Sequence, residues 1–231
     1  MAGEGDLDDV TVIVPAFNEA TSIGAVVAEL RTVFPHVVVV DDGSTDATAD
    51  LARTAGASVV QHPINLGAGA AVQTGFDYVR HQTSSRICVT FDADGQHLTS
   101  DAVHLVDALR SSNADVALGT RFVAATSQIP TVRRLVLRAG GVFTRITTQA
   151  RVSDPHNGLR AFRTDALSAI SLRQSGMAHA SELHNQIAAA RLRFVEVPTT
   201  VLYTDYSRSK GQPSMNAVNI VFDLALAKLR A

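Results

Sequence analysis

Short apolar runs alternate with amphipathic stretches along the first half of the chain. The runs are rich in β-branched residues and predict buried strands; they span residues 10–14, 37–40, 58–61, 87–91 and 116–118. Between the first two runs, apolar residues recur at helical spacing from Ile23 to Leu30. We expect the first strand to stop at Pro15 and this helix to be capped by Thr21 or Ser22.

The alternation continues to residue 120 and then loosens. The glycine-punctuated segment 65–71 leads into a predicted helix that ends near residue 81. Further helices are predicted at residues 47–55, around 103–109, and at 128–149, 165–172, 180–190 and 216–230; later strands are predicted at 194–197 and 199–203. Alternating strands and helices predict an α/β fold, in which a mostly parallel sheet is covered by helices on both faces.

Polar residues gather where these strands end, at residues 15–19, 41–46, 92–96 and 119–121. Ligands of such sheets bind outside the carboxyl ends of the strands. The sequence therefore predicts a site along one edge of the sheet.

Two carboxylates, Asp92 and Asp94, follow a buried strand, and Gln96 offers a third oxygen. Hard cations such as Mg²⁺ and Mn²⁺ take oxygen ligands and leave positions open for phosphate. The alternative is an ordinary turn, because Asp and Gly are common turn residues. The position at the end of a buried strand favours the metal site.

Adjacent carboxylates, Asp41 and Asp42, end the second strand. Thr45 or Asp46 in this segment could cap the next helix, but a cap does not explain the paired charges. Their repulsion requires a compensating donor or cation, which a nucleobase or ribose would supply.

Basic residues and histidines give weaker signals. Candidate phosphate contacts, each also explicable as a solvated charge, are Arg121, Arg133, Arg134, Arg160, Arg208 and Lys210. His97 and His156 lie in polar loops, and the histidines expected at the surface are His36, His62, His81 and His104.

Composition limits the function classes. The 231 residues suit one large domain, and 46% hydrophobic with 18% charged residues is a globular composition. A net charge of −2 argues against nucleic-acid binding. One cysteine, Cys88, excludes an internal disulfide and is expected to be a buried apolar residue. No apolar stretch is long enough to span a membrane, so the default expectation is a cytoplasmic protein.

Five motifs together resemble the family 2 glycosyltransferases. They are PAFNE at 15–19, DDGSTD at 41–46, NLG at 65–67, DADGQH at 92–97 and GTR at 119–121, and their order and spacing match as well. Within the family, the chain most resembles the polyprenyl-phosphate (dolichol-phosphate) mannosyl- or glucosyltransferase branch. DPHNGLR at 154–160 is similar to that branch's Asp-x-x-x-Gly-Phe-Arg element.

The resemblance implies a GT-A fold that binds a nucleotide-diphosphate sugar of the GDP-mannose or UDP-glucose type. It implies that the nucleoside pocket is lined by Pro15, Ala16, Asn18, Glu19 and Asp42. It gives Asp92, Asp94 and Gln96 to a Mg²⁺ or Mn²⁺ under the diphosphate, with Asp92 also a substrate contact.

The same resemblance supplies the residues around the phosphates and the reacting centre. Arg121, Arg134 and Arg160 would face phosphates of the donor or acceptor, and Asp154 would lie near the reacting centre. Arg208 and Lys210 match the branch's basic C-terminal loop only loosely.

The implied reaction is a hexosyl transfer with inversion. A polyprenyl phosphate is the favoured acceptor, since its oxygen is already anionic and arginines can position it. A hydroxyl on a saccharide or small natural product is the alternative, and it would require a carboxylate base. Asp154 and Glu182 are the candidates, although Glu182 has the equal alternative of an ordinary helix carboxylate.

Two other classes are weaker. A nucleotidyltransferase usually has a Gly-rich loop with Arg and Lys after its first strand, where this chain has residues 15–19. A non-catalytic nucleotide-sugar-binding module would not need the intact acidic cluster.

The domain expectation is a disordered acidic tail at 1–9, a GT-A catalytic domain at 10–215 and an amphipathic helix at 216–231. That helix could pack on the sheet, which is the first expectation. The alternatives are that it lies on the inner face of the membrane, meets a membrane protein, or forms a homodimer surface.

Overall fold

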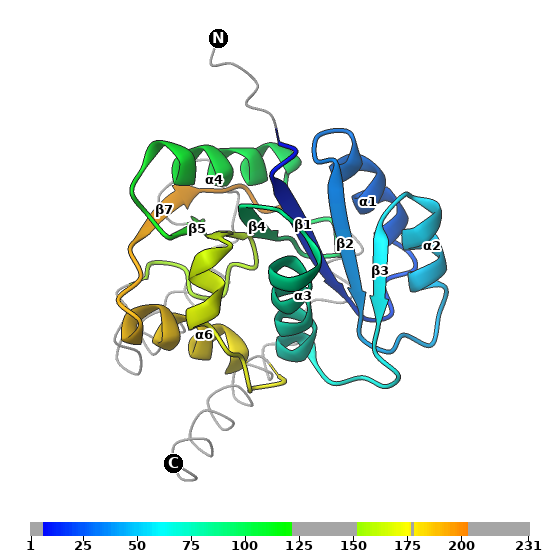
Figure 1. The fold of residues 1–231 in the computed structure, drawn as a ribbon. Coiled ribbons are helices and arrows are strands. Elements are labelled where there is room, and N and C mark those ends of the chain that lie inside the picture. The colour runs from blue at the N-terminus through cyan, green and yellow to red at the C-terminus, as the bar shows by residue number, and fades with distance from the viewer. Residues whose placement is uncertain (1–6, 122–151, 177, 203–231) are drawn as a thin grey trace, which may run out of the picture.

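The computed structural model describes residues 7–121, 152–176 and 178–202. In this part of the chain, seven strands form one sheet in the order β3-β2-β1-β4-β6-β5-β7 (Figure 1). Their bounds are β1 (Val10–Ala16), β2 (His36–Asp41), β3 (Ser58–Gln61), β4 (Ile87–Thr90), β5 (Val116–Thr120), β6 (Arg160–Arg163) and β7 (Phe194–Pro198). Neighbouring strands are parallel except around β6, which is antiparallel to β4 and β5. The mostly parallel sheet is confirmed.

Helices cover both faces of this sheet (Figure 1). Their bounds are α1 (Ile23–Arg31), α2 (Thr48–Thr54), α3 (Ala68–Gln82), α4 (Thr99–Ser111), the 3₁₀ helix η1 (Asp165–Ala169) and α6 (Ala178–Ala189). Along β1, Val12 and Val14 pack in a core with α1 and α4, whereas Ile13 packs in a second core with α3 and α6. Successive side chains of a strand point to opposite sides of the sheet, so a continuous apolar run such as β1 supplies apolar side chains to both faces. Among the described residues, none of the helices has the length and apolarity to cross a membrane.

The first strand does not stop at Pro15, contrary to expectation. β1 continues to Ala16, whose carbonyl accepts a hydrogen bond from Asp42 N on the β2 side. Pro15 instead faces the β4 side, and β4 has already ended opposite Ile13. The missing N–H of Pro15 therefore interrupts no ladder, which is where proline is tolerated in a sheet.

Other sequence expectations also need correction. Of the predicted helix at 165–172, only η1 forms, and residues 199–202 contribute one isolated bridge, between His97 and Val201, rather than a strand. Residues 7–9 of the expected tail join the fold: Leu7 packs on the first core, and Asp9 O accepts hydrogen bonds from Arg86 N and Ile87 N. The predicted helices at 128–149 and 216–230 lie outside the described residues.

Strand β6 was not predicted, and its position matters for the site. Arg160, its first residue, pairs with Thr90 of β4 and Leu118 of β5. Because β6 runs antiparallel to these strands, the loop before it lies at their carboxyl ends. The fold therefore brings residues 152–159 to the edge that carries the acidic strand ends.

Candidate active site

The loops after β1 and β2 interlock through backbone and short side chains. Asn18 N donates to Ser44 Oγ over 2.9 Å, and Thr45 N donates to Asn18 Oδ1, also over 2.9 Å. Glu19 N donates to Thr48 Oγ1 over 2.8 Å. The loops at residues 15–19 and 42–48 are thus joined side by side, and a nucleoside pocket between them stays a prediction.

Asp42 is buried and makes hydrogen bonds inside the protein. Its Oδ1 accepts from Leu66 N at 2.9 Å and lies 2.7 Å from His62 Nδ1, and its Oδ2 accepts from Gly67 N at 2.7 Å. His62 Nε2 also lies 2.9 Å from Thr74 Oγ1. The expectation that a ligand must compensate Asp42 is therefore wrong, because the segment around residues 62–67 already does so.

Two further corrections follow from this network. His62, expected at the surface, has a side chain only 9% exposed. Asp41, the other adjacent carboxylate, accepts hydrogen bonds from Ser44 N and Gln61 Nε2. The sequence around residue 62 does not indicate that His62 is buried, because its burial depends on Asp42, a partner 20 positions away.

Asp92 lies where three parts of the chain meet. Its Oδ2 accepts a hydrogen bond from His97 Nε2 at 2.9 Å. A Cβ placed on Gly158 would lie 2.2 Å from both carboxylate oxygens, so only glycine allows the loop 152–159 to approach so closely. Thr90 Oγ1 holds the same loop by donating to Gly158 O over 2.7 Å. Two sequence-predicted motifs are therefore in direct contact.

The two carboxylates of this loop have opposite pKa shifts. Protein atoms crowding Asp92 would raise its pKa, but the hydrogen bond from His97 and the charges of His97, Arg160 and His179 outweigh this and lower it. Burial, followed by the charge of Asp92, raises the pKa of Asp94, although hydrogen bonds from Gln96 act in the opposite direction. A cation between the carboxylates would relieve this repulsion.

The donor set fits a hard divalent cation. Asp94 accepts hydrogen bonds from Gln96 N and Gln96 Nε2, which keeps the amide beside the carboxylate. The side chain of Asp92 remains 49% exposed and can take a further ligand. The described residues contain no cluster of three His, Cys, Asp or Glu side chains placed to hold a metal. A cation here would draw its remaining ligands from water or phosphate oxygens, as Mg²⁺ commonly does.

Asp154 and Arg121 form a bidentate ion pair. Arg121 Nε and Nη2 donate to the two oxygens of Asp154, each over 2.6 Å, and Arg121 N donates to Oδ2 over 3.1 Å. Planar double contacts of this kind fix a guanidinium strongly. The structure thus brings together two predicted catalytic residues, Arg121 directly after β5 and Asp154 in the loop 152–159.

Arg160 lies between this ion pair and the acidic loop. It is 4% exposed, and its Nη2 donates to Pro155 O over 3.3 Å. Burial lowers its pKa, while the charges of Asp92 and Asp154 raise it in part. The neighbouring carboxylates allow a buried guanidinium at this position.

Glu182 of α6 binds the backbone of the segment before its helix. Its carboxylate accepts from Arg173 N at 3.0 and 3.1 Å and from Gln174 N at 2.8 Å. That segment packs on the start of α3, where Gly69 N donates to Ser175 O over 3.1 Å. The described contacts give Glu182 the ordinary structural role that was the alternative to a catalytic base.

Three predicted substrate contacts, Arg134, Arg208 and Lys210, lie outside the described residues, as does Arg133. The sequence missed two histidines of α6, His179 and His184, which are near enough to Arg160 for its charge to lower their pKa values; burial is the larger cause for both. Their spacing along the helix carries no metal or catalytic motif, so only the fold reveals them.

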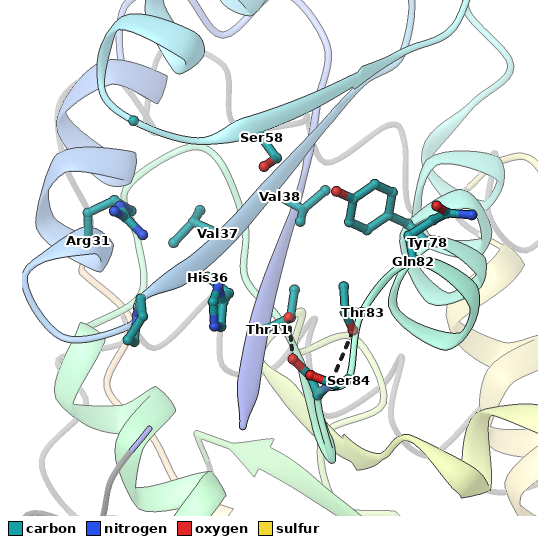
Figure 2. Close-up of a pocket in the computed structure, with 13 residues that line it drawn as sticks. Thr11, Arg31, His36, Val37, Val38, Ser58, Tyr78, Gln82, Thr83 and Ser84 are labelled. Carbon is teal, nitrogen blue, oxygen red and sulfur yellow. Dashed lines mark hydrogen bonds between the residues drawn. The ribbon is translucent and has the colours of Figure 1, made fainter. Parts of the chain in front are cut away.

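A hollow of about 330 Å³ lies away from this site, at the opposite edge of the sheet (Figure 2). It is lined by the beginnings of β1, β2 and β3 and by the ends of α1 and α3, with Arg31, His36 and Tyr78 among its walls. Helix carboxyl ends favour basic side chains, which accounts for Arg31 in the last turn of α1. The acidic strand ends, and not this hollow, form the candidate active site.

Comparisons with known proteins agree with the geometry. The undecaprenyl-phosphate mannosyltransferase of Micrococcus luteus is 32% identical over 213 residues, 87% of this chain and 86% of the relative. The polyprenol monophosphomannose synthase of Mycolicibacterium smegmatis is 32% identical over 222 residues, 90% and 82% of the two chains.

Among solved structures, glucosyl-3-phosphoglycerate synthase from Mycobacterium tuberculosis, in complex with Mn²⁺, UDP and glucosyl-3-phosphoglycerate, superposes with a TM-score of 0.70. The identity is 21%, and the match covers 96% of this chain and 83% of that one. This likeness confirms the GT-A fold. Glycosyl transferase family 2 matches residues 11–171, and the chain therefore belongs to this family of glycosyltransferases.

Proposed function

We propose that this glycosyltransferase transfers a hexose, with inversion and with the help of a divalent metal, from a nucleotide-diphosphate sugar to a polyprenyl phosphate. The acceptor class is supported by relatives named for undecaprenyl phosphate and polyprenol. The donor class and the metal are supported by a fold neighbour crystallised with UDP and Mn²⁺. GDP-mannose and UDP-glucose are the two donor types to test first.

Each loop of the site has a part in this proposal. The interlocked loops carrying residues 15–19 and 42–48 would hold the nucleoside, with Asp42 shaping the wall through its bonds to residues 62–67. Asp92, Asp94 and Gln96 would hold Mg²⁺ or Mn²⁺. When bound, the metal neutralises the charge that develops on the leaving diphosphate.

The observation that carries the acceptor assignment is that both candidate bases are occupied. Asp154 is fixed by Arg121 in the bidentate pair, and Glu182 accepts hydrogen bonds from the backbone of residues 173 and 174. A hydroxyl acceptor needs a base within hydrogen-bond reach of its proton. A phosphate acceptor is already anionic, so Arg121 and Arg160 need only position it.

The direct test is product formation from one radiolabelled sugar donor and two acceptors. A short-chain prenyl phosphate and a neutral saccharide would compete in the presence of Mn²⁺. We expect label in the prenyl-phosphate product. Label in the saccharide alone would replace the phosphate acceptor by a hydroxyl acceptor.

Two variants test the same assignment from the side of the base. Glu182→Gln keeps a side-chain oxygen for the backbone donors and should retain activity within about threefold. Asp154→Asn should lower activity about tenfold, because Arg121 loses one charge-assisted hydrogen bond and is held less firmly. A loss above about a thousandfold in either variant, with nucleotide binding intact, would indicate a catalytic base and a hydroxyl acceptor.

A lipid-linked acceptor places the enzyme at a membrane surface, and we propose peripheral attachment at the inner face. We also propose, as alternatives, that the enzyme docks on a membrane protein or forms a homodimer. The segment 216–231 expected to take part lies outside the described residues. Sedimentation with vesicles containing prenyl phosphate, compared with neutral vesicles, would test attachment.

A further inference from the structure

His156 lies in the loop 152–159 with an unusual hydrogen-bonding state. Its Nδ1 is buried and has no hydrogen-bond partner among the residues that the structure describes. Nor does Nε2 bond to any of the residues that the structure describes. The residue as a whole is only half-buried. Because Nδ1 is enclosed, Nε2 is the nitrogen that an incoming ligand can reach.

Charged groups surround this ring. Burial lowers the pKa of His156; the charges of Arg121, Arg160 and His179 lower it further, and only the charge of Asp154 raises it. The imidazole is therefore neutral near pH 7. A proton on the enclosed Nδ1 would have no acceptor among the described residues, so the favoured neutral tautomer carries its proton on Nε2, where it can be donated to a ligand.

The surrounding charges also indicate what this donor would bind. Arg121 is paired with Asp154, and Arg160 lies near both Asp154 and Asp92. The positive charges of the two arginines are thus balanced by two carboxylates. A phosphate that enters here needs additional N–H donors, and an uncharged donor provides one without adding to the repulsion among cations.

We propose that His156 is a further substrate contact, which donates from Nε2 to a phosphate oxygen beside Arg121 and Arg160. The inference rests on the proposed function, because both need a phosphate at this edge of the sheet. The oxygen belongs either to the diphosphate of the donor or to the phosphate of the acceptor, and the binding measurements below separate these sources.

The test uses His156→Leu, which removes the donor, and His156→Gln, whose amide nitrogen can replace Nε2. His36→Leu, an exposed histidine at the opposite edge, is the matched control. Calorimetry would give the Kd of UDP and of GDP with Mn²⁺, and steady-state assays would give KM for a short-chain prenyl phosphate.

We expect His156→Leu to weaken one of these interactions about tenfold or more, the usual effect of losing a hydrogen bond to a charged group. His156→Gln should recover most of it, and His36→Leu should match the wild type. A raised KM with unchanged nucleotide Kd assigns the oxygen to the acceptor, and a weakened nucleotide Kd assigns it to the donor. If His156→Leu stays within twofold of the wild type throughout, the inference is wrong.

Side-chain NMR separates failure of this inference from failure of the proposed function. If the wild type shows no turnover with any acceptor, the proposed function fails. Long-range ¹H–¹⁵N spectra of the histidines would then be recorded with inorganic phosphate and with UDP and Mg²⁺. A shift of His156 Nε2, absent for His36, would support the contact, and unchanged His156 signals would overturn it.

Discussion

A buried carboxylate, Asp42, controls the geometry of the segment that follows β3. It accepts hydrogen bonds from two backbone N–H groups, and His62 links it to Thr74 of α3. Hydrogen bonds to a buried charge contribute about 1.5–3 kcal/mol each, and a carboxylate left short of donors keeps its desolvation cost. The contacts of Asp42 therefore connect the loop after β2 to α3.

Removal of His62 should accordingly destabilise the fold. We expect His62→Phe to lower the free energy of unfolding by about 1–3 kcal/mol, because Oδ1 of Asp42 loses a donor while it stays buried. Urea denaturation followed by circular dichroism measures this. His36→Phe, at an exposed position, is the control and should change stability by less than about 0.5 kcal/mol. Equal effects of the two substitutions would mean that the Asp42 network contributes little.

A second buried histidine, His184, makes stability depend on pH. Burial lowers its pKa to about 3, with a further contribution from Arg160, and Nδ1 donates to Ala180 O over 2.6 Å. The folded state therefore holds neutral His184, whereas the unfolded state binds a proton below about pH 6.5. The stabilisation is present above that pH and is lost as the pH falls toward 3.

Between pH 7.5 and pH 5 this linkage should remove about 2 kcal/mol of stability. His184→Leu cannot take up the proton, so its free energy of unfolding should fall by about 2 kcal/mol less over the same interval. Urea titrations at the two pH values measure both proteins. Parallel pH dependences would show that His184 is accessible to protons in the folded state.

At the scale of elements, the start of α3 is pressed against the segment before α6. A Cβ on Gly69 would lie 1.9 Å from Gln174 O and 2.8 Å from His179 Cβ. Glu182 holds that segment from the other side through its backbone N–H groups. The start of α3 and the segment before α6 are thus packed together at a point where only glycine fits.

Alanine at two comparable glycines should have opposite effects. Gly69 and Gly24 are both the second residue of a helix, but a Cβ on Gly24 would meet nothing within 4 Å. Gly69→Ala should cost about 1–3 kcal/mol, since the backbone of residue 174 must move. Gly24→Ala should be neutral or stabilise by up to about 1 kcal/mol. Thermal unfolding of both variants measures this, and similar midpoints would contradict the close contact.

The sequence predicted the parallel half of the sheet well because β1, β2 and β4 are buried on both faces and read as apolar runs. It missed β6, which has Arg160 and Arg163 at its ends. Arg163 donates to the carbonyls of Leu109, Ser112 and Ala114 at the end of α4, and Arg160 is balanced by carboxylates of distant loops. Such long-range partners let charged residues enter a strand, and a local pattern does not reveal them. His62 was misassigned for the same reason.

For the whole molecule, the sheet divides the site between its two parts. β1, β2 and β4 carry the loops expected to hold the nucleotide and metal, whereas β5 and β6 carry Arg121 and Arg160. The parts meet where Gly158 contacts Asp92. The strand-end motifs were predictable because parallel strands end at a common edge. The position of the loop 152–159 beside these motifs was not predictable, because it depends on the antiparallel strand β6, which the hydrophobic pattern did not indicate.

This division predicts how nucleotide and metal stabilise the whole fold. A ligand that binds only the folded state raises stability by about 2.7 kcal/mol at 100 times its Kd. We expect UDP or GDP to raise the melting temperature only when Mn²⁺ or Mg²⁺ is present. Asp94→Asn should abolish the metal-dependent part, because it removes one of the two carboxylates proposed to hold the metal, the one whose pKa is raised by burial and then by the charge of Asp92. Asp50→Asn, at a side chain 85% exposed, should respond like the wild type.

A metal-dependent shift that survives in Asp94→Asn would mean that the metal does not bind at the end of β4, since the remaining carboxylate, Asp92, already has His97 and Arg160 beside it. If no nucleotide shifts the folded wild type, the donor site itself is wrong.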